Sequence, residues 1–225
     1  MAELNLEAVD TDGAIREAAE DVSGDTRMSF LRKGAMTGGA ALTGGAILGA
    51  LIPGTALAKG APPSSFGKGD IGILNYALTL EYLESSYYNE VHKNGVVTTT
   101  TGKTLLNTVV KDENYHVKFL KKALGRHAAK KPTFDFGKAT SSEAEFIATG
   151  YVLENTGVHA YLGQAGNIKT PAYLIAAAEI VTVEGRHAGA FGILAGKAVA
   201  PNTLDVPWTA EKVLKAVKGT HFIKG

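Results

Sequence analysis

The chain has 225 residues, and its 23 Lys and Arg against 22 Asp and Glu give a formal net charge of +1 at pH 7. A charge this close to neutral, without basic runs interleaved with aromatic residues, excludes the electrostatic footprint of a nucleic-acid-binding protein. Cysteine is absent, which excludes a disulfide scaffold, thiolate metal sites and cysteine nucleophiles. Any metal must therefore be held by histidine and carboxylate side chains, a donor set that suits iron, manganese or zinc.

The N-terminal part differs in composition from the rest. Residues 1–25 are polar and acidic with little periodicity, which predicts a disordered leader. Residues 26–58 follow the order of an export signal: basic residues, then a Gly- and Ala-rich apolar run, then the small-residue sequence ALA. The stretch TRMSFLRK resembles a twin-arginine signal, although Met28 stands where the second Arg should be. We expect an exported protein, periplasmic or extracellular, with an uncleaved membrane anchor as the alternative.

Residues 59–69 have the Pro-, Gly- and Ser-rich composition of a linker, and residues 70–225 are expected to form one helical domain. In this domain apolar residues recur with a helical period in four long segments. Ser142 with Glu145 forms a capping box at the start of the third, and Thr170 followed by Pro opens the fourth. The predicted helices are 70–93, 103–124, 142–163 and 171–194, with a short fifth helix at 209–217.

These segments predict an all-α fold, an antiparallel four-helix bundle with a short C-terminal helix. The longest connection between the four helices lies between the second and the third. A long crossover at this point is one of the established topologies of four-helix bundles.

Two of the helices carry the same polar motif, a glutamate followed three residues later by a histidine. The pairs are Glu113 with His116 and Glu184 with His187. Residues three apart lie on one face of a helix and can converge on one ion. One such pair has little specificity, but two in apolar helices are a stronger signal of a metal site.

The other two long helices place carboxylates on apolar stripes. Glu154 is the only charge on its face of the third helix, and Glu81 and Glu84 lie on the core face of the first. An isolated buried carboxylate costs several kcal/mol. These stretches supply no inward-facing Lys or Arg, so the carboxylates require another counter-charge, and a pair of divalent cations would provide it.

The chain resembles the ferritin-like superfamily, and more narrowly the bacterial ferritin-like domain proteins of the desiccation-related type. The resemblance covers about residues 70–196 and rests on ILNYALTLEYLESSYY, DENYHVKFLKKAL, VLENTGVHAYLGQA and VEGRH. It implies a ferritin-like bundle with two Fe or two Mn ions, with Zn as an alternative metal. The implied ligands are Glu81, Glu113, His116, Glu154, Glu184 and His187.

Within this set the resemblance implies that Glu113 and Glu184 bridge or chelate the metals. Each histidine would bind one metal, with Glu81 and Glu154 as terminal ligands. Three further residues stay open as alternative ligands or as partners that orient a ligand: Glu84, His159 and Tyr151.

Two functions are compatible with these residues. The first is redox chemistry on O₂, peroxide or Fe(II), of a ferroxidase, peroxidase or catalase-like kind. The alternative is a non-catalytic metal-binding or structural bundle acting in stress or desiccation. Metal ions are the expected partners and nucleic acid is not. The membrane is a partner only through the export signal, and the sequence leaves open whether the chain forms homo-oligomers.

Overall fold

The computed structural model describes residues 60–224, which belong to one compact unit. The predicted leader (1–25) and export signal (26–58) lie outside the described residues. The helices of the described part are α5 (Gly69–Asn94), α6 (Thr100–Leu124), α7 (Glu143–Ala165), α8 (Pro171–Leu194) and α9 (Ala210–Thr220). Short 3-10 turns are η1 (Ser64–Phe66), η2 (Gly125–His127) and η3 (Gly137–Thr140), and the strands are β1 (Thr133–Phe134) and β2 (Ile223–Lys224).

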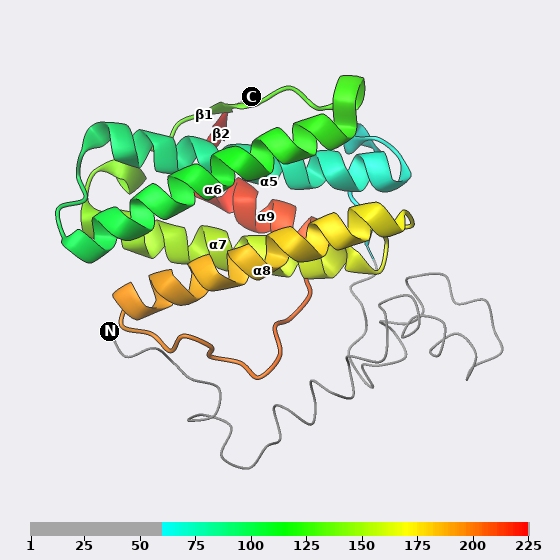
Figure 1. Ribbon diagram of the computed structural model, residues 1–225. Coiled ribbons are helices and arrows are strands. Elements are labelled where there is room, and N and C mark those ends of the chain that lie inside the picture. Colours follow the sequence, from blue (N-terminus) through cyan, green and yellow to red (C-terminus); the bar gives the residue numbers. More distant parts are fainter. Residues whose placement is uncertain (1–59, 225) are drawn as a thin grey trace, which may run out of the picture. The chain divides into compact units, whose positions relative to one another are not determined.

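The four long helices form two antiparallel pairs, α5 with α6 and α7 with α8, as Figure 1 shows. The crossover from α6 to α7 contains η2, β1 and η3, and it runs along the outside of the first pair. Its strand β1 pairs antiparallel with β2 at the C-terminal end of the chain, with Phe134 opposite Ile223. The short helix α9 packs against α7. The all-α prediction and the long crossover are confirmed.

Helix N-termini in this bundle are capped across helix pairs. α6 begins three residues before the predicted start, because Thr99 Oγ1 accepts a hydrogen bond from the Gly102 N–H at 3.1 Å. The carboxylate of Glu143 accepts from the N–H groups of Thr98 and Thr99 at 2.8 and 3.1 Å. These contacts satisfy donors that a helix start leaves free. The threonines before α6 therefore form its N-terminal cap.

The apolar core is divided into two clusters. One is aromatic and lies toward the C-terminal end of α5, where the Phe146 and Phe191 rings pack edge to face, with centroids 5.1 Å apart. The other, which includes Leu78, Leu120 and Ile180, lies toward the opposite end of the bundle. The buried glutamates and histidines of the four helices lie between the two clusters. The packing of both ends therefore fixes the helices around this central layer.

Part of the predicted linker packs on the bundle. Asn75 Nδ2 donates to the Phe66 carbonyl at 3.0 Å, and the rings of Phe66 and Tyr76 meet edge to face. Gln164 donates to the Gly60 carbonyl at 2.9 Å. Within residues 60–224, no helix is both long enough and apolar enough to cross a membrane.

Candidate metal centre

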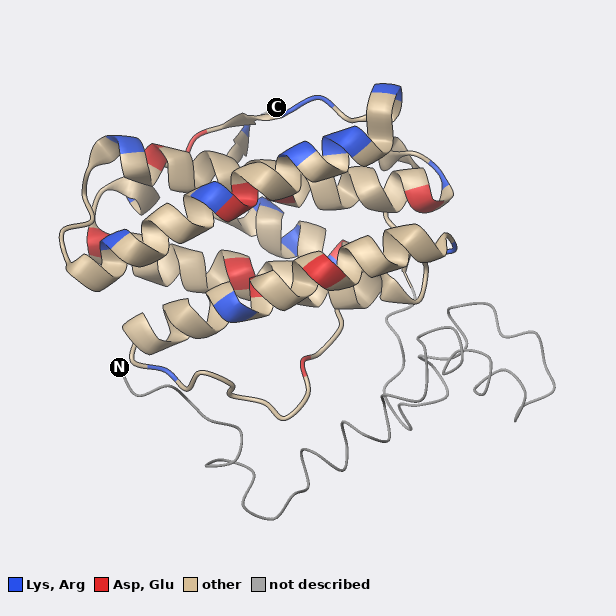
Figure 2. Ribbon diagram, in the orientation of Figure 1, with Lys and Arg blue, Asp and Glu red and all other residues tan. Residues whose placement is uncertain are grey.

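The six residues predicted as ligands lie together in the central layer of the bundle. Each of the four long helices contributes at least one of them, and acidic residues are visible near the middle of α7 and α8 in Figure 2. The four glutamates have no exposed surface, and the two histidines are also buried. The residues of this layer are Glu81, Glu113, His116, Glu154, Glu184 and His187.

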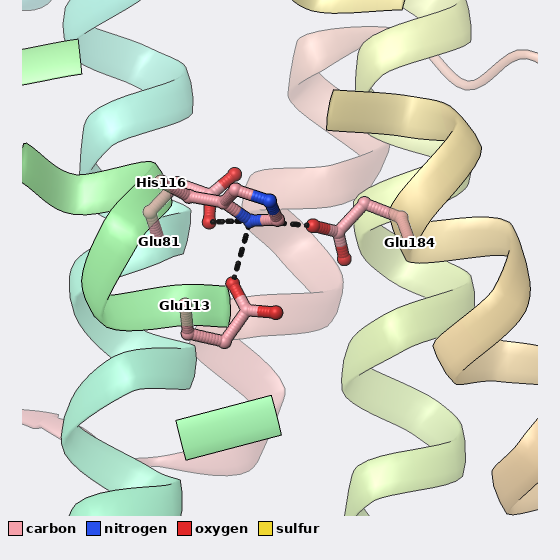
Figure 3. Close-up of side chains that lie close together, drawn as sticks. All are labelled: Glu81, Glu113, His116 and Glu184. Carbon is pink, nitrogen blue, oxygen red and sulfur yellow. Dashed lines mark hydrogen bonds and ion pairs between the residues drawn. The ribbon is translucent and has the colours of Figure 1, made fainter. Parts of the chain in front are cut away.

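The first group surrounds one nitrogen of His116. Its Nδ1 atom lies 3.1 Å from Glu113 Oε2, 3.2 Å from Glu184 Oε1 and 3.3 Å from Glu81 Oε2. Figure 3 shows the three carboxylates converging on this nitrogen from α5, α6 and α8. An imidazole nitrogen carries at most one proton, so it cannot donate a hydrogen bond to all three.

The second group surrounds His187 in the same way. Its Nδ1 atom lies 3.1 Å from Glu113 Oε1 and 3.2 Å from Glu154 Oε2. Two sets of possible ligand atoms result, each with all of its atoms within 4.8 Å of one another. The first set consists of Glu81, Glu113, His116 and Glu184, and the second of Glu113, Glu154, Glu184 and His187. Glu113 and Glu184 belong to both sets, which is the arrangement required of bridging carboxylates.

The layer is rich in acceptors without donors. Four buried carboxylate oxygens accept no hydrogen bond: Glu81 Oε2, Glu113 Oε1 and both oxygens of Glu184. Within residues 60–224, the ion-pair partners of these glutamates are the two histidines and no Lys or Arg. A buried unpaired carboxylate oxygen is costly. The unpaired oxygens and the two imidazoles therefore fit divalent cations such as iron, manganese or zinc, which carboxylate and imidazole ligands bind.

Burial and mutual charge shift the ionisation of the metal-free layer. Burial, together with the charge of Glu81, raises the pKa of Glu113 to about 8. Burial and the charge of Glu113 raise the pKa of Glu184 well above its usual range. Burial lowers the pKa of His187, but the adjacent carboxylates of Glu113 and Glu154 outweigh this and raise that pKa to about 11. Without metal, the layer therefore retains protons that a bound cation would displace.

Two tyrosines hold the terminal carboxylates. Tyr161 of α7 donates its hydroxyl to Glu81 Oε1 on α5 at 2.5 Å, and Tyr88 of α5 donates to Glu154 Oε1 on α7. Each bond crosses between the two helix pairs. Because one oxygen of each carboxylate is occupied in this way, the other oxygen is directed toward its histidine.

Asp112 is a residue of the site that the sequence analysis missed. Its Oδ2 atom lies 3.3 Å from Nε2 of His187, on the ring edge opposite the carboxylates. Carboxylates often hold the outer nitrogen of a metal-binding histidine, which fixes the tautomer and the ring orientation. The sequence signal that could have identified Asp112 is its position, since it is an acidic residue immediately before the predicted ligand Glu113.

The three open residues lie in different places. Glu84 is buried in the central layer, although outside both sets of ligand atoms. His159 is half-buried and stacks on Trp208, with ring centroids 4.4 Å apart, away from the carboxylates. The Tyr151 ring is also half-buried and lies under Lys197 Nζ, 5.0 Å from the ring centroid. The tyrosines that donate to carboxylates of the layer are Tyr88 and Tyr161.

One face of the layer can be reached from outside. A cavity of about 230 Å³ opens between α6 and α8, with His116 in its wall. Carboxylates of Asp112 and Glu179 and the exposed ring of Tyr115 line its mouth. The cavity gives small solutes a path to the His116 edge of the site.

The chain matches the model of a known protein family. A family model described as a ferritin-like domain matches residues 69–197, more than half of the chain. No curated protein matches the chain. All six residues of the two sets lie within the matched segment.

Proposed function

The chain belongs to the ferritin-like domain family, and from this premise we propose that it binds two metal ions, iron or manganese, and uses them in redox chemistry on O₂, peroxide or Fe(II). The superfamily resemblance noted from the residues is confirmed, whereas membership of the desiccation-related subgroup stays a prediction. The observation that carries the proposal is the pair of buried ligand sets that share Glu113 and Glu184.

The residues would divide their tasks as follows. Glu113 and Glu184 would help to hold both cations and neutralise their charge, because each residue contributes to both sets. Each histidine would serve one metal through Nδ1, with Glu81 and Glu154 completing the outer positions. When bound, a pair of redox-active ions would supply two-electron chemistry. The protein holds the side chains that would bind these ions in place.

The chain's other residues would prepare this site. The hydrogen bonds from Tyr161 and Tyr88 fix which oxygen of Glu81 and Glu154 faces inward. Asp112 accepts a hydrogen bond from the Nε2–H of His187, which keeps the proton on Nε2 and leaves Nδ1 free to act as a ligand. The cavity beside His116 is large enough for O₂, peroxide or a hydrated cation, while the two apolar clusters keep bulk water from the ends of the layer.

We also propose that the protein is exported, periplasmic or extracellular. The support is the order of basic, apolar and small residues in the segment 26–58. Expression of the full chain with fractionation of the cell would test this, and retention of all of the protein in the cytoplasm would contradict it.

The test of the metal site is the metal content of the purified protein beside the Glu113→Ala/Glu184→Ala double variant. About two Fe or Mn ions per chain are expected in the wild type and none in the variant. Glu179→Ala at the exposed mouth of the cavity is the control and should keep its metal. Absence of metal from a correctly folded wild type, reconstituted anaerobically with Fe(II) or Mn(II), would contradict the proposal.

Activity is tested separately on the loaded protein. Consumption of peroxide or O₂-dependent oxidation of Fe(II), lost in the double variant, is the expected result. Metal binding without any turnover would instead support the non-catalytic metal-binding bundle.

A further inference from the structure

Glu84 is a buried carboxylate that the six-residue site does not use. Its side chain is 3% exposed, and it faces the same layer from α5, one turn after Glu81. Because none of the sets of ligand atoms includes it, it adds a fifth buried carboxylate to a layer that already lacks counter-charge. Burying a further carboxylate among like charges is energetically unfavourable, so another interaction is expected to offset its cost.

The two helices that carry the terminal ligands have matching patterns. On α5, Tyr88 lies seven residues after Glu81, and on α7, Tyr161 lies seven residues after Glu154. The two tyrosines bond to each other's glutamate, so these positions are structural counterparts. By the same count, the counterpart of Glu84 is Gly157.

Gly157 provides the space that Glu84 occupies. A Cβ atom at residue 157 would lie 3.4 Å from Glu84 Oε1 and 3.1 Å from Glu184 Oε2. A Cβ there would press on Glu184 and touch Glu84, and a longer side chain would enter the space that Glu84 occupies. The first helix pair therefore carries an additional carboxylate, Glu84, at the position where the second pair has a glycine, Gly157.

The neighbours of Glu84 place it on one side of the layer. Glu81 of α5 faces His116, and Tyr88, farther along the same helix, donates a hydrogen bond to Glu154. Glu84 lies one turn beyond Glu81, in the direction of Tyr88. Glu154 belongs to the set of His187 and not to that of His116. Glu84 thus lies nearer to the His187 position.

We propose that Glu84 is a seventh protein ligand, specific to the metal position of His187, and that Gly157 makes room for it. This inference rests on the proposed metal site. It makes the two metal positions chemically different, because the His187 position can gain a carboxylate that the His116 position cannot.

The first test is Mn²⁺ binding to the metal-free full chain, followed by calorimetry, with Co²⁺ absorption as a second readout. Glu84→Gln should weaken one of two binding steps about 10- to 100-fold and leave the other within about twofold. Equal affinities in wild type and variant, or equal weakening of both steps, would overturn the proposal. If the wild type binds no metal, the failure lies with the proposed function instead.

The second test assigns the affected position. In a His187→Ala background, which keeps the His116 set intact, Glu84→Gln should change the remaining Mn²⁺ affinity by less than about twofold. In a His116→Ala background it should retain its full effect. The reverse pattern would place Glu84 on the other metal.

A third pair of variants separates a ligand from a mere charge. Glu84→Asp keeps the charge but shortens the side chain, so a ligand should lose affinity and a distant charge should not. The matched control is Glu90→Gln, also on α5, whose carboxylate accepts from Thr140 Oγ1 at 2.9 Å. Binding by Glu84→Asp as in the wild type would overturn the proposal.

Discussion

The two helix pairs of the bundle repeat one pattern. Asp70 at the start of α5 accepts from the N–H groups of Lys169 and Thr170 before α8, at 3.0 and 2.8 Å. Glu143 at the start of α7 does the same for the residues before α6. Glu143 follows Asp70 by the same interval as Glu154 follows Glu81. The frame around the central layer is therefore close to two-fold, and this produces two similar sets of ligands.

The two helix pairs differ at the residue that precedes the glutamate of each Glu-x-x-His motif. Asp112 precedes Glu113 in α6, whereas Val183 precedes Glu184 in α8. As a result, Nε2 of His187 has a carboxylate partner, while His116 lines an open cavity whose wall includes Val183. The comparison teaches that the shared pattern makes two metal positions and that a few unmatched residues make them unequal.

The largest expected effect is from removing one histidine at a time. His116→Ala and His187→Ala should each reduce the metal content from two ions to roughly one per chain, since each histidine belongs to a single set. Elemental analysis after anaerobic loading measures this. Loss of both ions in either variant would show that the two positions do not bind independently.

Removal of the tyrosine hydroxyls tests the symmetric part of the comparison. Tyr161→Phe and Tyr88→Phe each leave a buried carboxylate oxygen without its donor. Each should lower the free energy of unfolding of the metal-free protein by about 1.5–3 kcal/mol. Urea unfolding in a chelator gives both values. A large effect from one tyrosine and none from the other would contradict their equivalence.

Asp112→Asn tests the asymmetric part. The amide keeps the size of the side chain but weakens the acceptor for Nε2 of His187, so the affinity at that position should fall about 10- to 100-fold. The affinity at the His116 position should stay unchanged in the same titration. Val183→Asn, which alters the counterpart residue, is the control for a general disturbance of the layer.

The smallest effect is expected from the caps. Hydrogen bonds from Thr99 and Thr98 lower the pKa of Glu143 to about 2. A lowered pKa stabilises the folded state above the unfolded-state pKa of about 4.3, and this stability is lost as the pH falls toward 2. Glu143→Gln should therefore cost about 1 kcal/mol at pH 7, where screening of this partly exposed group limits the effect, and less near pH 2. Thermal unfolding at both pH values measures the difference, and a cost that does not depend on pH would contradict the assignment to the charged form.

Much of the fold could be predicted because helical periodicity and caps are local. The Ser142 cap was correctly identified, with its Oγ 3.2 Å from the Glu145 nitrogen. The start of α6 was predicted three residues too late: its Thr99 cap is local, but Glu143, which holds the residues of that cap, is distant in the sequence. The strand pair of Thr133–Phe134 with Ile223–Lys224 was also missed. Its two strands are far apart in the sequence, and each is too short, at two residues, to show a periodic pattern.

The sequence by itself predicted the helices, the two Glu-x-x-His pairs and the carboxylates on the other core faces, because a charge on an apolar stripe is visible one helix at a time. The choice of six ligands among them came from the resemblance to a family and stays a prediction. The resemblance implied that Glu113 and Glu184 are shared, and the tertiary structure places both of them in both sets. Only the tertiary structure placed Tyr88 and Tyr161 on each other's glutamate, Asp112 behind His187, and Glu84 opposite Gly157. These pairings join residues of different helices, so they depend on how the helices pack around the layer and not on spacing along the chain.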